Sequence, residues 1–338
     1  MLSIIMALRN LMFDKGWILK QTQFELPIIS VGNLSVGGTG KTPHTEYLVK
    51  LLKEQVSHMA VLSRGYGRST KGFRYVETSS KARDVGDEPL QIKQKFPDIT
   101  VAVCEKRVVG ITKLLQPEPK SLVPAAIVLD DAFQHRYVKP GLSILLTDYR
   151  RPYYADHVMP WGRLRECRSG AKRADIIIVT KCPAELSDAE RRRIVDKLKP
   201  LAHQQVLFTS FAYDTPRMFR SQAEVALPSS LLVLTGIAKP APLYDYLESK
   251  GCVLQKLAFP DHHSFTPTDV QRINKACEQL PADAKILTTE KDAARLQHLE
   301  GLSPQVLQAL VVQPIKISFL FNETERFNKI LSDYVGTN

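Results

Sequence analysis

One stretch near the amino terminus, residues 26–52, constrains the fold of this chain more than any other. It begins with a run of apolar and β-branched residues, continues into a loop with several glycines, and ends in a helical pattern that opens with Lys41 and Thr42. Glycines in such a loop let backbone N–H groups surround phosphate oxygens without a clash from Cβ atoms. The helix that follows points the positive end of its dipole at the same anion. A strand, a glycine loop and a helix in this order therefore predict a nucleotide site, with ATP as the expected ligand.

The predicted phosphate loop departs from the strict motif G-x-x-x-x-G-K-[ST] at its first position. Ser35 stands where the first glycine belongs, and glycines stand instead at 37 and 38. We expect Lys41 to reach the β- and γ-phosphates and the Thr42 hydroxyl to bind Mg²⁺. A glycine-rich turn without a ligand is the alternative interpretation. The residues expected to hold the nucleotide are Ser35, Val36, Gly37, Gly38, Thr39, Gly40, Lys41 and Thr42.

The overall charge of the chain is strongly positive, at +11 over 338 residues. Such a charge predicts attraction to an anionic partner: a nucleic acid, a membrane surface or a phosphorylated substrate. The sequence has no basic stripe interleaved with aromatic residues, so we do not expect a nucleic-acid partner. Its five cysteines are scattered without a CxxC pair, which argues for reduced thiols and against a disulfide framework or a zinc site. Nothing in the sequence indicates an obligate protein partner.

The first 20 residues form an apolar segment with helical periodicity. Arg9, Asp14 and Lys15 interrupt the segment, so it is too short in uncharged length to cross a bilayer. A helix of this kind lies at a membrane surface or packs against the core of its own protein. The sequence leaves both possibilities open.

Apolar segments alternate with helical ones along most of the chain, a pattern typical of a doubly wound α/β fold with a mostly parallel sheet. The phosphate loop would then lie at the carboxyl edge of the first strand of that sheet. The expected strands after the first are 58–63, 99–103, 125–130, 142–147, 175–180, 206–211, 231–236, 285–289 and one or two strands within 310–321.

The pattern restarts near residue 205, which predicts a second, smaller α/β lobe and a ligand cleft between the two lobes. The predicted division is an amphipathic membrane-surface helix at 1–20, a P-loop nucleotide-binding domain at 21–204, a smaller α/β domain at 205–305, and a tail at 306–338 that packs back on the core.

Adjacent carboxylates at two points indicate candidate metal or catalytic groups. Asp130 and Asp131 end the predicted strand 125–130. Paired carboxylates are costly to bury unless a cation offsets their desolvation, so a Mg²⁺ site is favoured over a structural role there. Asp87 and Glu88 stand at a predicted helix start, where carboxylates often serve only as capping residues. For this second pair, the residues alone leave the structural and the functional interpretation open.

One later loop contains Asp261, His262 and His263. Because no third ligand stands at metal spacing, these residues suit proton transfer better than zinc binding. Histidines without a function on a surface loop are an equally open interpretation. Arginines at 64 and 68, and again at 163 and 165, form candidate anion clamps or solvated loops.

Eight motifs in a fixed order connect these observations. They are VGNLSVGGTGKTP (31–43), SRGYGR (63–68), GDEP (86–89), DDAFQH (130–135), GRLRE (162–166), TGIAKP (235–240), FPDHHSF (259–265) and TEKDAAR (289–295). Together they resemble the tetraacyldisaccharide 4′-kinase family, the lipid A 4′-kinases of Gram-negative bacteria, over nearly the whole chain. The displaced first glycine agrees with the pattern of that family. Ala132 departs from it, because the family usually has glycine there, but the change removes no functional side chain.

The resemblance implies an ATP-dependent kinase of lipid A biosynthesis. Such an enzyme transfers the γ-phosphate of ATP to the 4′-hydroxyl of an acylated glucosamine disaccharide phosphate, tetraacyldisaccharide 1-phosphate. It is expected to be a peripheral protein on the cytoplasmic face of the bacterial inner membrane. The amphipathic helix and the positive charge are consistent with that membrane surface.

The resemblance also assigns roles to individual residues. Asp87 would be the general base, paired with a histidine of the 261–263 loop; we assign His262, although the sequence does not exclude His263. Lys41, with Mg²⁺, would neutralise charge on the transferred phosphoryl group. The implied metal ligands are Thr42, Glu88, Asp130 and Asp131, and the implied substrate contacts are Arg68, His135 and Arg165.

Two other functions fit part of the same pattern. A phosphate-loop enzyme that acts on a soluble small molecule would share the nucleotide site but would not bind vesicles. A regulatory NTPase would hydrolyse nucleotide slowly and would transfer no phosphate to an acceptor.

Overall fold

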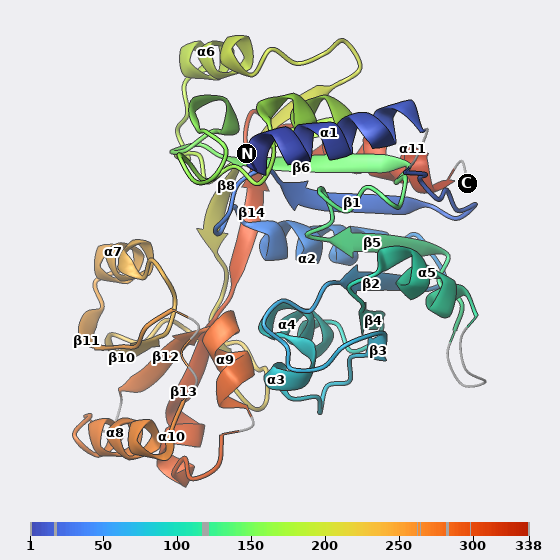
Figure 1. Ribbon diagram of the computed structural model, residues 1–338. Coiled ribbons are helices and arrows are strands. Elements are labelled where there is room, and N and C mark those ends of the chain that lie inside the picture. Colours follow the sequence, from blue (N-terminus) through green and yellow to red (C-terminus); the bar gives the residue numbers. More distant parts are fainter. Residues whose placement is uncertain are drawn as a thin grey trace.

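The computed structural model shows two α/β lobes joined by a pair of long strands (Figure 1). It describes residues 2–16, 19–116, 122–261, 263, 265–281, 284–297 and 299–336. The described helices of the large lobe are α1 (Leu2–Lys15), α2 (Lys41–Leu52), α3 (Ala82–Val85), α4 (Asp87–Lys95), α5 (Arg107–Leu115), α6 (Asp188–Leu198) and α11 (Thr324–Gly336), with 3₁₀ turns at Tyr153–Ala155 and Arg168–Arg173.

The large lobe is built on a nine-stranded sheet with the order β14-β8-β7-β6-β1-β5-β2-β4-β3. All neighbours pair in parallel except the two edge strands, β3 and β14, which are antiparallel to theirs. Its strands are β1 (Ile28–Asn33), β2 (Met59–Ser63), β3 (Arg74–Tyr75), β4 (Thr100–Val103), β5 (Ala126–Asp130), β6 (Leu142–Asp148), β7 (Ile176–Thr180), β8 (Gln205–Tyr213) and β14 (Ile315–Phe319). The predicted doubly wound, mostly parallel fold is confirmed.

Helices cover both faces of this sheet. On one face, Leu48 of α2, Ile92 of α4 and Phe327 of α11 pack into one apolar core with alternate residues of the strands. On the other face, α5 and α6 contribute to two further cores. Every residue of the central strand β1 is buried, because helices lie on both sides of it. This arrangement brings the carboxyl ends of β1 and β5 together at one edge, where the phosphate loop and the acidic pair lie.

The smaller lobe has its own five-stranded sheet with the order β11-β10-β12-β13-β9. Its strands are β9 (Arg217–Met218), β10 (Ser230–Thr235), β11 (Val253–Ala258), β12 (Lys285–Thr289) and β13 (Leu310–Gln313). Its helices are α7 (Ala241–Ser249), α8 (Pro267–Glu278), α9 (Glu290–Leu296) and α10 (Pro304–Ala309). Two apolar clusters fill the space between these helices and the sheet, one with residues of α7 and the other with residues of α8, α9 and α10.

The division between the two sheets differs from the boundaries predicted at residues 205 and 305. Strand β8 begins at Gln205 but pairs with β7 in the large sheet, so the smaller sheet starts only at β9. The segment 310–321 forms two strands that belong to different sheets: β13 closes the smaller lobe, and β14 returns to the large one. Apolar periodicity finds such strands but carries no information on which sheet each one joins.

Helix α1 lies on the large lobe near the carboxyl edge of the sheet (Figure 1). Phe13 is buried against the protein, whereas Leu8 and Leu11 remain about half exposed, at 52% and 51%. Within the described part of the chain, none of the helices has the length and apolar character needed to cross a bilayer.

Candidate active site

The phosphate loop connects β1 to α2 and is ordered by contacts inside the large lobe. Gly37 and Gly40 have φ angles of 104° and 88°, a region that side chains rarely adopt, so both positions require glycine. The buried His44 ring fixes the start of α2: its Nδ1 lies 2.7 Å from the Gly40 carbonyl and its Nε2 lies 3.0 Å from Thr209 Oγ1. Burial lowers the pKa of His44 to about 4, so this ring is neutral near pH 7.

The start of the loop explains why Ser35 replaces the expected glycine. Ser35 forms an antiparallel bridge with Leu164 of the GRLRE motif. The flanking backbone bonds, Val36 N to Arg163 O and Arg165 N to Leu34 O, are 2.8 and 2.7 Å long. Extended backbone of this kind suits any residue, so a glycine is not needed at this position. Because the bridge ties GRLRE to the phosphate loop, it also carries Arg165 into the site.

A cation–anion cluster lies beside the phosphate loop. Arg165 Nη1 is 3.1 Å from both carboxylate oxygens of Asp131, and Lys41 Nζ is 3.7 Å from Asp131 Oδ1. The structure therefore brings three of the predicted residues together, from the end of β5, the GRLRE loop and the start of α2. Lys41 and Arg165 are only partly exposed, which suits binding of an anion more than a solvated surface role.

Asp130, at the end of β5, is completely buried. Burial raises its pKa to about 7, and the neighbouring charges of Glu88 and Asp131 add to that rise. Its carboxylate accepts hydrogen bonds from Thr45 Oγ1 at 3.2 Å and Ser63 Oγ at 3.3 Å. A cation would relieve this concentration of negative charge, so the residues present fit a magnesium ion.

Protein ligands alone do not complete such a metal site. Among the residues that the structure describes, no three His, Cys, Asp or Glu side chains come together as a ready metal shell. Mg²⁺ is usually held by one or two carboxylates together with phosphate oxygens and water, and the acidic pair beside the phosphate loop matches that pattern.

The turn after the acidic pair packs closely on β1. A Cβ atom at Gly32 would lie 2.7 Å from Cβ of Phe133, so only glycine permits this approach. Asp131 takes a left-handed conformation with φ 46°, whereas Ala132 is not among the positive-φ residues and is buried. The alanine that departs from the family pattern therefore fits here without backbone strain.

The two other predicted substrate contacts lie on the same lobe but differ in their surroundings. Arg68 donates to Glu105 Oε1 at 2.7 Å and to the Gly72 carbonyl at 2.6 Å, and its side chain is only 2% exposed. These contacts order its own loop. His135 lies beside Arg107, and burial lowers the pKa of His135 to about 4.

Asp87 is the first residue of α4 and faces the smaller lobe. It lines a cleft of about 680 Å³ between the lobes, together with Glu88, Tyr66, His263 and Arg295. Gly86 precedes it with φ 95°, which sets the sharp turn that aims Asp87 into the cleft. Asp87 Oδ2 accepts hydrogen bonds from Arg295 Nε at 3.1 Å and from Arg295 Nη2 at 2.7 Å.

His262 and His263 are the two candidates for the histidine that pairs with Asp87. His262 lies outside the described residues, so its predicted pairing with Asp87 stays a prediction. His263 Nε2 lies 2.8 Å from Asp269 Oδ2, and its ring stacks on Phe259 with centroids 5.0 Å apart. Since Asp269 also caps α8 through Thr266, His263 has a clear structural role.

Three residues at the site were not singled out by the sequence analysis. Arg295 was only part of a quoted motif, and its contact with Asp87 crosses between the lobes. Lys181 follows β7 with φ 59°; its ammonium group contacts the Gly38 carbonyl and lies 3.0 Å from Asp148 Oδ2. The buried Arg107 donates to the Cys104 carbonyl at 2.6 Å and to the Asp130 carbonyl at 3.3 Å. A charged residue directly after a strand could have indicated Lys181.

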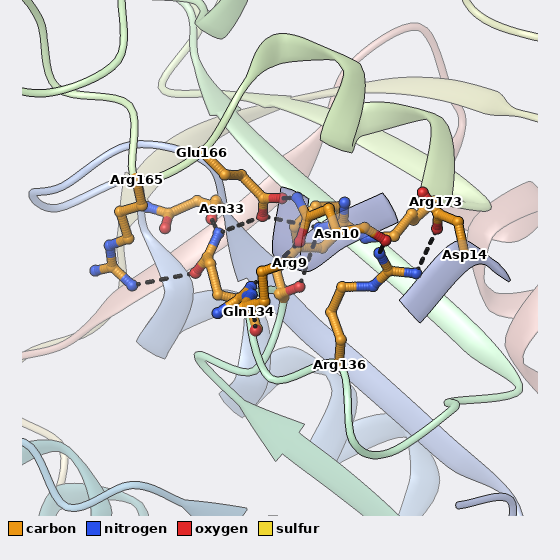
Figure 2. Close-up of polar contacts among 10 residues, drawn as sticks. Arg9, Asn10, Asp14, Asn33, Gln134, Arg136, Arg165, Glu166 and Arg173 are labelled. Atoms are coloured by element: carbon orange, nitrogen blue, oxygen red, sulfur yellow. Dashed lines mark hydrogen bonds and ion pairs between the residues drawn. The ribbon is translucent and has the colours of Figure 1, made fainter. Parts of the chain in front are cut away.

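Figure 2 shows how α1 joins the network behind the site. Glu166, which is fully buried, accepts from Asn10 Nδ2 at 2.8 Å, from Arg173 Nη2 at 2.8 Å and from Gln134 Nε2 at 3.1 Å. Gln134 also donates to the Asn33 carbonyl at 2.7 Å, and Asn33 Nδ2 donates to Thr39 Oγ1 at 2.7 Å. Helix α1 is thus linked, through Glu166 and Gln134, to the strand end that leads into the phosphate loop.

A doubly wound sheet with a phosphate loop after its central strand and a buried acidic pair at the end of the adjacent strand defines a P-loop nucleotide-binding protein. A family model described as tetraacyldisaccharide-1-P 4′-kinase matches residues 1–335. The chain belongs to this family, so the predicted family is confirmed.

Individual relatives agree along nearly the full length. The chain is 44% identical to a tetraacyldisaccharide 4′-kinase of Bacteroides thetaiotaomicron, over 99% of this chain and 90% of the relative. It is 46% identical to one of Flavobacterium johnsoniae, over 99% of this chain and 94% of the relative. A crystal structure of LpxK from Aquifex aeolicus in complex with ATP superposes with a TM-score of 0.76 at 27% identity, covering 99% of this chain and 96% of that one.

Proposed function

We propose that this protein is a lipid kinase of lipid A biosynthesis that transfers the γ-phosphate of ATP to the 4′-hydroxyl of tetraacyldisaccharide 1-phosphate. One observation carries the proposal beyond family membership. Glu88 lines the interlobe cleft and is also close enough to Asp130 to raise its pKa. The cleft that contains Asp87 therefore adjoins the acidic pair beside the phosphate loop, so an acceptor in the cleft faces bound nucleotide.

Asp87 serves as the general base in this mechanism. A sugar hydroxyl is a weak nucleophile near neutral pH, so its proton must leave as the oxygen bonds to phosphorus. The proton moves to the Asp87 carboxylate, the O–P bond to the γ-phosphate forms, and the bond to the ADP oxygen breaks. His262 is the proposed dyad partner of Asp87.

Positive groups of the large lobe stabilise the charge on the transferred phosphoryl group. Lys41 and Arg165 lie together at the acidic pair, within reach of the phosphates that the loop would bind. Thr42, Asp130 and Asp131, with Glu88, would hold Mg²⁺, which supplies further positive charge at the phosphates when it is bound. We place Arg68 and His135 at the edge of the acceptor site, with Arg68 acting through the loop that it orders.

Helix α1 is the proposed contact with a membrane surface. Its polar residues Asn10 and Asp14 contact Glu166 and Arg136 of the large lobe, and Leu8 and Leu11 are exposed. Exposed leucines on a chain of net charge +11 suit an interface with anionic lipid, in which the acylated substrate would reside. We place the protein as a peripheral enzyme on the cytoplasmic face of the bacterial inner membrane.

Radiolabel transfer tests the reaction. The protein is incubated with γ-labelled ATP, Mg²⁺ and tetraacyldisaccharide 1-phosphate in mixed micelles, with Lys41→Ala as the control. We expect label in the lipid, and its loss in the variant. Label that accumulates only as inorganic phosphate, whether or not lipid is present, would instead indicate a regulatory NTPase.

Sedimentation with vesicles tests the membrane contact separately. Wild-type protein should sediment with anionic vesicles at physiological salt, and a Leu8→Ser, Leu11→Ser double variant should sediment less. Val253→Ser is the matched control, because Val253 is an exposed apolar residue of the smaller lobe, 70% accessible. Equal sedimentation of all three proteins would rule out α1 as the membrane contact.

A further inference from the structure

The smaller lobe contacts Asp87 through one arginine. Arg295 extends from α9, and its Nε and Nη2 both donate to Asp87 Oδ2, at 3.1 and 2.7 Å. The two side chains are 7% and 22% exposed, so solvent screens this pair less than an ordinary surface pair. Two donors on one oxygen restrict rotation of the carboxylate as well as attracting it.

The third nitrogen of the same guanidinium forms hydrogen bonds within the smaller lobe. Arg295 Nη1 donates to the Gly236 carbonyl and to Asp292 Oδ1, both at 3.1 Å. Asp292 is fully buried and accepts in turn from Gly236 N at 2.9 Å and Thr289 Oγ1 at 2.8 Å. Two sequence motifs, TGIAKP and TEKDAAR, thus build a support that holds Arg295 at a fixed place in the smaller lobe.

The close approach in this support depends on a small residue. A Cβ atom at Gly236 would lie 3.0 Å from Asp292 Oδ1, within the tight range of contacts. The geometry therefore constrains both ends of Arg295: one end by Gly236 and Asp292 of its own lobe, and the other by Asp87 of the large lobe.

We propose that Arg295 is a positioning residue that orients the Asp87 carboxylate when the two lobes are in contact. This inference rests on the proposed role of Asp87 as the base. Because the support of Arg295 belongs entirely to the smaller lobe, orientation of the base depends on contact between the lobes. Nucleotide bound while the lobes are apart then meets a base that lacks the contacts from Arg295, which limits loss of ATP to water.

A double-mutant cycle tests this role through the variants Arg295→Gln, Asp87→Asn and their combination. In single-turnover transfer from γ-labelled ATP to the lipid acceptor, Arg295→Gln should lower the rate roughly 10- to 100-fold, the range expected when a reacting group is misplaced. The KM for ATP should stay within about twofold, because the phosphate loop is not touched. In the Asp87→Asn background, the same arginine change should cost less than about threefold, because the group on which it acts is already absent.

Two further variants guard against a loss of folding. Arg295→Lys keeps a positive charge beside buried Asp292 but offers one donor nitrogen in place of three, so its rate should lie between those of wild type and Arg295→Gln. Arg193→Gln removes an exposed arginine paired with Glu190 on α6 and should leave the rate unchanged. All assays are run at a temperature where circular dichroism shows every variant folded; if Arg295→Gln is not folded at any usable temperature, the cycle is read with Arg295→Lys.

The outcomes distinguish an error in the role of Asp87 from an error in the role of Arg295. Near wild-type transfer by Asp87→Asn would overturn the base assignment and the role of Arg295 with it. An impaired Asp87→Asn beside a fully active Arg295→Gln would overturn only the positioning role. A loss from Arg295→Gln that is as large without Asp87 as with it would show that Arg295 acts elsewhere, and would also overturn the inference.

Discussion

The phosphate loop and Asp87, the proposed base, are held in two different ways. Contacts that order the loop come from the large lobe: Asn33 and Thr180 hold Thr39, and His44 holds the Gly40 carbonyl. The contact between Asp87 and Arg295 instead joins the two lobes. A nucleotide site can thus be built inside one lobe, whereas the proposed acceptor chemistry depends on how the second lobe is placed.

The largest effect should come from the proposed base, Asp87. Asp87→Asn keeps the shape of the side chain but removes its ability to take a proton, so turnover should fall roughly 10²- to 10⁴-fold. Nucleotide affinity, measured by fluorescence titration with an ATP analogue, should stay close to wild type. A parallel loss of nucleotide affinity would contradict the separation of the two regions.

A second prediction concerns an ion cluster that links α2 of the large lobe to α9 of the smaller lobe. Lys95 Nζ lies 2.6 Å from Glu46 of α2 and 2.6 Å from Glu290 of α9. Burial, and then the charge of Glu290, raises the pKa of Glu46 from 4.5 to about 7. Between these two pH values the unfolded chain binds fewer protons at this residue than the folded chain does, so the free energy of unfolding falls as the pH rises through that interval.

The variant Glu46→Gln removes this pH dependence. Relative to wild type, its free energy of unfolding should increase by about 3 kcal/mol between pH 4.5 and pH 7.5, the amount that corresponds to the pKa difference. Urea unfolding at the two pH values measures the change. The control Glu54→Gln, at an exposed position near the end of the same helix, should show no such trend. An equal difference at both pH values would mean that Glu46 is not held protonated by the fold.

A smaller effect should come from the glycines of the phosphate loop. Gly37 has φ 104°, whereas Gly38 is not among the positive-φ residues, and an added Cβ meets nothing within 4 Å at either position. Gly37→Ala should therefore lower the free energy of unfolding by about 1–2 kcal/mol through backbone strain alone. Gly38→Ala is the matched control, with an expected change below about 0.5 kcal/mol. Equal stability of the two variants without nucleotide would contradict the prediction that the large lobe holds Gly37 at a positive φ angle before nucleotide binds.

The smallest predicted effect concerns Lys181. Its ammonium group contacts the Gly38 carbonyl and so helps to hold the phosphate loop. Lys181→Met should therefore raise the KM for ATP about threefold, or roughly 0.7 kcal/mol, with little change in kcat. Lys199→Met offers a comparison at another left-handed lysine, at the exposed end of α6. A fall in kcat with unchanged KM would place Lys181 with the base rather than with the loop.

The sequence predicted those parts of the fold and site that local patterns encode. The phosphate loop, the strand that ends in Asp130 and the helix start at Asp87 depend on short-range periodicity and turn chemistry, so they could be located in advance. Strand β11 was missed because it is an edge strand with mostly exposed residues, such as Val253, and therefore lacks an apolar run. The pair between Asp87 and Arg295 joins positions 208 residues apart, a relation that no local pattern contains.

The pairing of β8 with β14 has a consequence for how such a protein could arise. Tyr213 lies opposite Ile315 in this antiparallel pair, so the chain leaves the large sheet and re-enters it at neighbouring points. The smaller lobe therefore occupies the place of a tight turn that could otherwise join β8 to β14 as a hairpin. Replacing residues 214–314 by Asn-Gly should regenerate that hairpin and leave a compact host that still binds nucleotide. Such a host would show that phosphate binding does not need the smaller lobe, as expected if that lobe was added to an older nucleotide-binding sheet.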